Sequence, residues 1–277
     1  MPLCTPPRDL PPTVPPAFQG LWRRRLLRAG GEVDTRTTVY WLQTARLYAD
    51  IRIPVDRPDC ESLADASART LQALARQQGF AGHLDVADDL LSWHRWLDFP
   101  PPAPVADVGR VHFEDDRLIE QGVHVPYLEE WVRIEGPHPD RLALRLVTEV
   151  TPAGIERQRI GVLVASGAHF MIAVARDQPL PAGVTLEDVL AAQGLSDRQR
   201  RTVLDCGIDF GRRQENRWEV SLSTLPFHEG EPFATVHGRW SWLHPELCLQ
   251  QLEDGRLRRW QTVERGAAFT GFGHAAA

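Results

Sequence analysis

Lysine is absent from this chain of 277 residues, so all 31 of its positively charged residues are arginine. The absence excludes enzymes that form a Schiff base through a lysine, and it excludes P-loop proteins, in which a lysine contacts the bound phosphates. Positive charge in general is in deficit, because the formal net charge is −6 and the densest positive cluster is the short run Arg23-Arg24-Arg25. We therefore expect no nucleic-acid partner.

Cysteine and long apolar runs are also scarce. Cys4, Cys60, Cys206 and Cys248 form no C-x-x-C pair, which argues against a zinc or redox motif and agrees with a reducing compartment. The first residues have neither the charged nor the apolar region of a signal peptide, and no apolar run approaches the roughly 18 residues of a membrane span. We therefore expect a cytoplasmic protein with no membrane partner.

The short motifs of common cofactor and metal enzymes are missing as well. The sequence contains no G-x-S-x-G, no G-x-G-x-x-G and no H-E-x-x-H, and its ten histidines form no H-x-H or H-x-x-x-H. We therefore expect no cofactor and no metal, although a metal site assembled from distant strands stays open.

What the sequence does contain is a pattern of elements that occurs twice. A tryptophan strand, an apolar strand, a helical stretch, a short strand and a second tryptophan strand follow one another in the same order. The first occurrence comprises Trp22, 45–53, 62–78, 79–86 and 91–99; the second comprises Trp131, 168–176, 185–204, 206–211 and the strand around Trp218. The repeat predicts an architecture far better than it predicts a reaction.

The spacing of apolar residues distinguishes strands from helices. Short runs of β-branched and aromatic residues between turns predict about fourteen to sixteen strands. Helical spacing appears only in 62–78, where Ser62 resembles a cap, and in 185–204, where Thr185 and Ser196 do. Many short strands with regular turns favour antiparallel barrels over a parallel sheet.

The resulting division of the chain has four parts. We predict a Pro-rich flexible arm at 1–17, a first barrel unit at 18–123, a second barrel unit at 124–265 and a tail at 266–277. Each unit is a curled antiparallel sheet with one helical segment at an end, so the predicted fold class is mainly β.

Gly20-Leu21-Trp22 resembles the G-x-W signature of lipocalins. Together with the repeat, the segments 118–122 and 127–131 resemble a fungal family of duplicated lipocalin-like proteins. The resemblance implies two lipocalin-like antiparallel β-barrel units and no particular reaction. Lipocalin-like barrels in general bind small apolar molecules, and a minority are isomerases or hydratases.

Strand alternation selects polar residues that can face a barrel interior. In residues 47–53 the aliphatic side chains share one face, and Asp50 and Arg52 share the other with Tyr48. If the aliphatic face packs outward, Asp50 and Arg52 point inward as a buried ion pair or a catalytic acid–cation pair. A solvated face is the alternative.

The strand 91–99 carries the histidine best suited to proton transfer. His94 shares a face with Trp96, whereas Trp93 lies on the opposite face. An imidazole can act as a general base near neutral pH, and a structural hydrogen bond is the plainer interpretation. The matching strands of the second unit lack an internal acid and a histidine, so we expect the pocket in the first unit or between the units.

Three functions fit these patterns. The first is binding of a small, largely apolar molecule in a barrel pocket, with ligand contacts from Trp22, Trp41, Gln43, Trp93, Trp96 and Arg52. The second is a cofactor-independent lyase, isomerase or hydratase, with His94 or Asp50 moving a proton and Arg52 stabilising an oxyanion or carboxylate. The third is a protein-interaction module that uses the Pro-rich arm.

Overall fold

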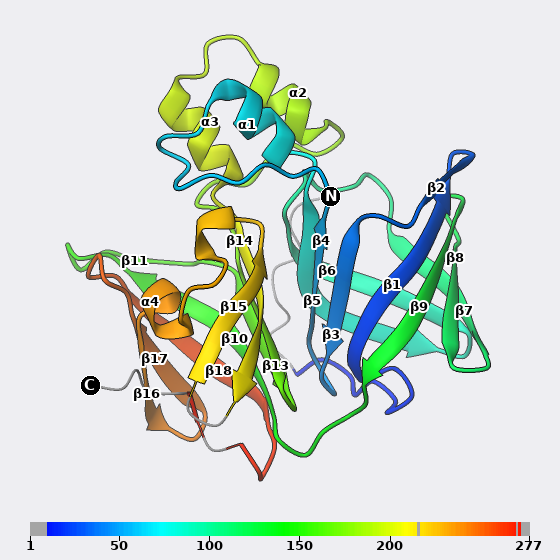
Figure 1. Ribbon diagram of the computed structural model, residues 1–277. Helices are drawn as coiled ribbons and strands as arrows, with labels where there is room; N and C mark the ends of the chain where they lie inside the picture. The colour runs from blue at the N-terminus through cyan, green and yellow to red at the C-terminus, as the bar shows by residue number, and fades with distance from the viewer. Residues whose placement is uncertain (1–9, 215–216, 270, 273–277) are drawn as a thin grey trace.

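The computed structural model describes residues 10–214, 217–269 and 271–272. The chain forms two antiparallel sheets that lie side by side, with three helices grouped above one end of both (Figure 1). The fold is therefore mainly β, as predicted.

The first sheet closes on itself. Its strands are β1 (Gly20–Ala29), β2 (Glu32–Asp34), β3 (Thr38–Gln43), β4 (Tyr48–Ile53), β5 (Gln78–Ala87), β6 (Leu90–Asp98), β7 (Asp107–Glu114), β8 (Arg117–Gly122) and β9 (Tyr127–Glu135). Each strand after β3 pairs with the next, and β9 pairs back with β1 from Leu21↔Glu135 to Ala29↔Tyr127. The short β2 extends β1 only, which leaves a closed eight-stranded barrel with no free edge.

The second sheet is a curled half-barrel. Its strands are β10 (Arg141–Val150), β11 (Glu156–Arg157), β12 (Gly161–Ser166), β13 (His169–Val174), β14 (Gly207–Gln214), β15 (Arg217–Ser223), β16 (Arg239–His244), β17 (Leu247–Gln251) and β18 (Leu257–Arg265). The order is β15-β14-β13-β12-β10-β18-β17-β16, and within the described residues β15 and β16 do not pair. The 3₁₀ helix η1 (Pro226–His228) and α4 (Phe233–His237) lie against β15 at this opening.

The order of strand pairing is the same in the two sheets, with helices after the third barrel strand of each. It differs from the predicted repeat at one place, because Trp131 lies in β9 and completes the first barrel. Strand β9, which we expected in the second unit, therefore pairs within the first sheet. The position equivalent to β1 in the second sheet belongs to β10.

The helices follow their predicted segments with one shift. α1 (Ala68–Leu74) begins after Ser67, whose side chain accepts the N–H of Thr70, whereas Ser62 caps only a turn. α2 (Leu186–Ala191) and α3 (Asp197–Leu204) begin at Thr185 and Ser196 as predicted, each with a complete capping box.

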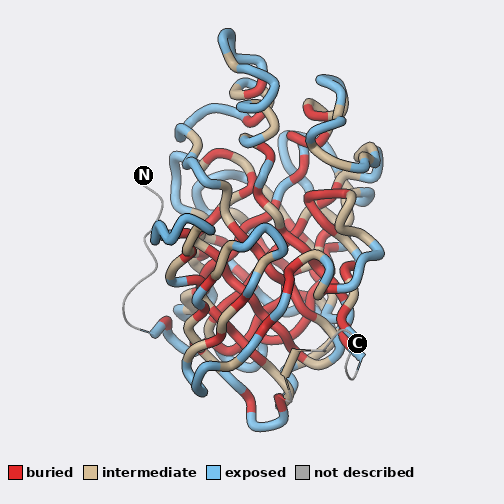
Figure 2. The backbone as a smooth tube through the Cα atoms, turned by 90° about the vertical axis from the view of Figure 1, so that its left-hand side faces the viewer, coloured by how far each residue is buried: buried red, intermediate tan, exposed pale blue. Residues whose placement is uncertain are grey.

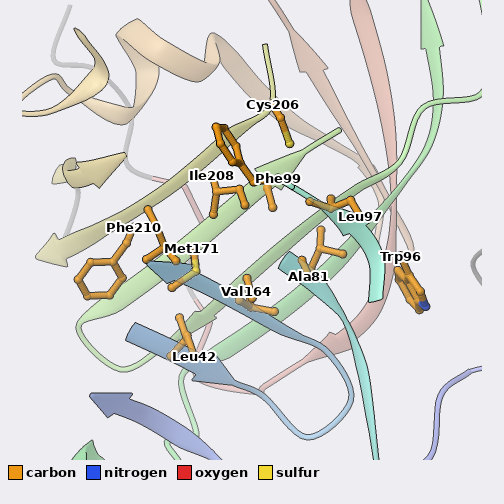
Figure 3. Packing of buried hydrophobic residues seen from close by; sticks show 14 of the residues in the cluster. Leu42, Ala81, Trp96, Leu97, Phe99, Val164, Met171, Cys206, Ile208 and Phe210 are labelled. Carbon is orange, nitrogen blue, oxygen red and sulfur yellow. The ribbon is translucent and has the colours of Figure 1, made fainter. Parts of the chain in front are cut away.

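The outer faces of the two sheets form a shared core. Leu42 and Ala81 of the barrel pack against Val164 and Met171 of the second sheet (Figure 3). Ile51 of β4 belongs to the same core. Leu71, Leu190 and Leu204 of the helices extend this core upward. Burial therefore runs through the body of the molecule, while the helical layer is mostly exposed (Figure 2). This arrangement confirms that the aliphatic face of β4 packs outward.

The described part of the Pro-rich segment packs against the barrel. Val14 is 1% exposed and belongs to the core inside the first sheet, and its N–H donates to the carbonyl of Ala45. Phe18 joins the same core, so residues 14–18 close one end of the barrel. Residues 1–9 of the predicted arm lie outside the described residues.

Candidate functional site

Aromatic side chains fill much of the first barrel. Trp22 stacks on Trp41, and Trp93 makes edge contacts with Trp41 and Tyr48 at 4.9 Å between ring centroids. The Nε1 of Trp22 donates to the carbonyl of Phe18. Three of the four predicted ligand-binding tryptophans therefore lie inside the barrel, but Trp22 and Trp41 serve mainly to fill its closed end.

Gln43, the predicted polar contact for a ligand, is bound by the protein itself. Its Oε1 accepts the Nε1 of Trp41 at 3.2 Å, and its Nε2 donates to the carbonyls of Thr44 and Leu47. The side chain is fully buried, so its hydrogen bonds hold the turn between β3 and β4.

Asp50 and Arg52 do face the barrel interior, as the alternation of β4 predicts. The Nε of Arg52 donates to Asp50 at 2.8 Å, and its Nη1 donates to Oε1 of Glu129 at 3.0 Å. Arg24 donates to the same Oε1 at 2.7 Å. Burial raises the pKa of Asp50, and the positive charge of Arg52 only partly offsets this effect. Burial also disfavours the charged guanidinium group of Arg52. The negative charges of Asp50 and Glu129 outweigh that effect and hold the pKa of Arg52 well above its ordinary value.

A β-bulge turns Asp98 toward this interior, where the regular alternation of β6 does not place it. The register shifts between Gly82↔Arg95 and Ala81↔Leu97, so Trp96 is the extra residue and the alternation of β6 changes after it. Arg95 consequently donates to Asp98 at 3.1 Å, and it also pairs with Asp107. Leu97, expected on the face of Trp93, packs outward into the shared core instead.

Glu120 is the most unusual side chain of this interior. It lies directly opposite Glu129 across β8 and β9, and both are at most 3% exposed. Two like charges opposite each other destabilise a sheet. Burial, with the neighbouring charges of Glu129 and Asp107, raises the pKa of Glu120 to about 8, whereas a hydrogen bond from Tyr127 lowers it.

The surroundings of Glu120 supply neutral hydrogen-bond donors. Trp93 and Trp131 donate to it through Nε1 at 3.2 Å each, and the hydroxyl of Tyr127 donates at 2.9 Å. Gly109 makes room for it, because a Cβ there would lie 2.5 Å from Oε1 of Glu120. Gly122, the cross-strand partner of Gly109, makes the same room for the ring of Tyr127.

A cavity of ≈ 210 Å³ opens beside Glu120, at the end of the barrel where β1 finishes and β9 begins. Its lining combines charged and aromatic side chains: Leu27, Ala29, Arg52, Phe80, Trp93, Arg95, Asp107, Glu120, Val125, Tyr127 and Glu129. Three carboxyl groups face two guanidinium groups, so the cavity has a surplus of acid. Of the predicted site residues, Arg52 and Trp93 line it, and Asp50 supports Arg52 from behind.

His94 and Trp96 lie outside this site, on the outer face of β6. The Nε2 of His94 is 2.9 Å from Oδ2 of Asp85, and its ring stacks on His83 at 4.4 Å. Trp96 is fully buried in the shared core. Because neighbouring residues of a strand face opposite sides, Trp93 in the interior places His94 outside, and the structure does not bring His94 to Asp50 and Arg52.

His83, Asp85 and His94 form the one cluster of metal-ligating side chains found in the described residues. The Nε1 of Trp96 donates to Nδ1 of His83 at 3.1 Å, so the neutral ring carries its proton on Nε2, which faces Asp85. Burial and His94 lower the pKa of His83 to about 4, which keeps the ring neutral. A metal at Nε2 needs a lone pair that this tautomer does not offer, so the cluster does not fit a metal ion.

The second sheet also has a polar interior, contrary to our interpretation of its sequence. Asp209 of β14 is fully buried and accepts a hydrogen bond from Ser223. The Nδ1 of His228 and the Nε2 of His237 lie 3.1 and 2.9 Å from its oxygens. Since these histidines belong to η1 and α4, the cluster ties both helices to the opening between β15 and β16.

No helix within residues 10–214, 217–269 and 271–272 is long and apolar enough to cross a membrane. No protein-family model matches the chain, and no curated protein matches it. The fold is similar to the crystal structure of an uncharacterized protein from Saccharomyces cerevisiae, with a TM-score of 0.53 at 14% identity over 90% of this chain and 99% of that chain. This similarity, to a protein of a fungus, shows a shared β-barrel architecture over nearly the whole chain and does not extend beyond the fold.

Proposed function

We propose that the first barrel binds a small organic cation in the cavity beside Glu120. The observation that carries the proposal is the direct opposition of two buried glutamates, Glu120 and Glu129, in a cavity whose third carboxyl group is Asp107. A bound cation reduces the electrostatic repulsion between these carboxylates. It also supplies a positive charge to a lining that has three carboxyl groups and two guanidinium groups.

The other lining residues suit such a ligand. Trp93 and Tyr127 contribute aromatic surface to the lining, and cations are attracted to aromatic faces where water is excluded. The ring of Phe80 shows this attraction already, because the guanidinium group of Arg95 lies 3.6 Å from its centroid. Both arginines that reach Glu129 donate to its Oε1, so neither occupies Oε2. Among the described residues, the donors to Glu120 are the neutral side chains of Trp93, Trp131 and Tyr127, so none of them forms an ion pair with it.

The charge of the lining refines the function predicted from the sequence. Five acidic or arginine side chains around ≈ 210 Å³ favour a compact, charged molecule over a largely apolar one. The size is below that of a typical drug-sized pocket, which restricts the ligand to a small amine, guanidine or quaternary ammonium group.

The test uses three probes of nearly the same shape: tetramethylammonium, tert-butanol and pivalate. Binding is followed by ligand-observed NMR and by the intrinsic tryptophan fluorescence, to which Trp93 in the cavity lining contributes. We expect only tetramethylammonium to bind, and we expect Glu120→Gln to weaken it. Glu130→Gln is the matched control, because Glu130 precedes Trp131 on the outer side of β9 and pairs with Arg117. Binding of pivalate in preference to tetramethylammonium contradicts the proposal.

A second candidate is proton transfer without a cofactor. A buried carboxyl group with a pKa of about 8 beside a cavity is typical of general acids and bases, and Glu120 has this property. Here Glu120 takes the role that we predicted for His94 or Asp50. Its test is deuterium exchange into small carbonyl compounds in heavy water, which Glu120→Gln abolishes and His94→Ala leaves unchanged if the assignment is right.

A further inference from the structure

A second and larger cavity lies between the two sheets. It has a volume of ≈ 580 Å³ and is formed where the end of β6 meets β10, the segment 157–160 that precedes β12, and the segment after β13. Its lining is Leu97, Asp98, Pro100, Pro102, Arg145, Leu146, Val147, Arg157, Gln158, Arg159, Ile160, Ala175, Arg176, Asp177, Pro179 and Leu180. We call it the intersheet groove. Its volume is in the range of pockets that hold small organic ligands.

One wall of the intersheet groove is rich in arginine. Arg157 and Arg159 donate to Glu149 at 2.6 and 3.3 Å, and both also pair with Asp177. The same carboxylate of Glu149 contacts two further arginines, Arg256 and Arg258, at 3.4 and 2.7 Å. Four guanidinium groups therefore share one buried carboxylate, and in the part of the chain that the structure describes Asp177 and Asp254 are the other acids paired with them. The surplus is positive, in a chain whose net charge is −6.

Arg176 adds a charge of a different kind. Its guanidinium group donates to the backbone carbonyls of Val203, Asp98 and Phe99 at 2.8, 3.1 and 2.5 Å. These contacts hold the group at the groove and join the barrel to the second sheet, but carbonyl groups do not neutralise its charge. An anion in the groove is stabilised by this charge without first displacing a carboxylate.

The remaining lining is apolar. Leu97 comes from the barrel, Leu146 and Ile160 from the second sheet, and Leu180 with Pro179 from the segment after β13. A positively charged wall that faces an apolar wall favours a ligand with an anionic group at one end and an apolar body.

We propose that the intersheet groove binds a small organic anion with an apolar body, such as a carboxylate or phosphate on an aliphatic chain. The anionic group lies against the wall of Arg157, Arg159 and Arg176, and the apolar body lies against Leu97, Ile160 and Leu180. The site is independent of the cation cavity, because it shares no lining residue with that cavity.

Calorimetric titration of the full chain tests the proposal with three probes of one chain length: decanoate, decyl phosphate and decyltrimethylammonium. We expect decanoate or decyl phosphate to bind and the ammonium probe not to bind at this site. The stronger of the two anions identifies the head group. The ammonium probe is also titrated into Glu120→Gln, in which the cation cavity of the barrel is weakened. Binding of this probe to Glu120→Gln with the affinity of the anions, or binding of neither anion, overturns the proposal.

Two variants locate the binding. Val147→Glu places a negative charge on the groove lining at a side chain that is 44% exposed, so the fold does not depend on it. We expect about a tenfold loss of anion affinity from one such charge in a partly buried site. Val33→Glu, at an exposed valine of β2, is the matched control and leaves the affinity unchanged.

Arg176→Gln removes the charge itself and lowers anion affinity by a similar factor. Because Arg176 also joins the two sheets, Val147→Glu decides the matter if Arg176→Gln does not fold. Unchanged affinity in Val147→Glu overturns the proposal, and so does an equal loss in Val33→Glu.

Discussion

Replacing Glu149 by glutamine tests how the arginine wall of the second sheet is held. The side chain of Glu149 is fully buried and its oxygens contact four guanidinium groups. Burial alone would raise its pKa, but Arg258 and Arg159 outweigh burial and bring the pKa to about 2. The fall from the ordinary value of 4.5 corresponds to roughly 3 kcal/mol in favour of the folded state at neutral pH.

Arg258, a partner of Glu149, contributes to the folding free energy with the opposite sign. Burial lowers the pKa of Arg258 to about 10, so holding this guanidinium charged in the fold costs a comparable amount. We expect the assembled cluster to be nearly neutral for stability, as buried ion pairs often are. Removing only the carboxylate leaves the arginines uncompensated, and Glu149→Gln should therefore lower the free energy of unfolding by about 3–5 kcal/mol.

Urea denaturation at pH 7 and at pH 3 measures this effect. The pKa of Glu149 is lowered in the fold, so its stabilisation is complete above the unfolded value of 4.5 and is lost as the pH falls toward 2. The difference between the variant and the parent should therefore shrink at pH 3. The control is Glu156→Gln, an exposed pair with Arg259 that should change stability by at most about 1 kcal/mol. A loss at pH 7 no larger than the control's, or one that does not shrink with pH, refutes the reasoning.

Three further predictions concern the barrel. The pKa of Glu120 is raised in the fold, so the parent protein loses stability as the pH rises above the unfolded value of 4.5. The free energy of unfolding of Glu120→Gln, measured by urea denaturation, should therefore increase relative to that of the parent between pH 5 and pH 9. A difference that is constant over this range argues against the raised pKa. His94→Ala should keep tetramethylammonium affinity within about twofold, and a tenfold loss in the NMR titration contradicts its placement outside the site. Gly109→Ala should lower the free energy of unfolding by about 1–3 kcal/mol, because the added Cβ would contact Glu120. Gly136→Ala is the control, since its Cβ would have open space around it. Equal urea midpoints for the two variants contradict the close approach of Glu120 to Gly109.

Local alternation predicted correctly which residues of β4 share the interior face of the barrel. The aliphatic residues of β4 needed an apolar partner, so Asp50 and Arg52 could be assigned to the interior from seven residues of sequence. The caps at Thr185 and Ser196 were equally local, since each depends on residues three positions apart.

Features that depend on distant pairings could not be predicted in the same way. The opposition of Glu120 and Glu129 follows from the register of β8 on β9, and the closure of the barrel follows from the pairing of β9 with β1. The bulge at Trp96 reverses an alternation that the sequence shows as regular. Gly109 and Gly122 were the available signal, because glycine inside a strand often marks close approach of another group.

His94 shows how a correct pattern can still give a different site. The sequence placed Trp93 and His94 on opposite faces, and the structure agrees. Alternation in the sequence does not indicate which of the two faces is interior. In the structure the face of Trp93 is interior, because Trp93 packs against Trp41 and Tyr48.

The most direct test of the central claim is the pH dependence of tetramethylammonium binding, because the charge of this probe does not change with pH. The cation favours ionised Glu120, whose pKa is about 8 in the free protein. We predict that the affinity for tetramethylammonium rises from pH 6 to pH 9, and that Glu120→Gln removes this rise while Glu130→Gln retains it. An affinity that is independent of pH in the parent, or a rise that persists in Glu120→Gln, contradicts the claim that this barrel binds cations at Glu120.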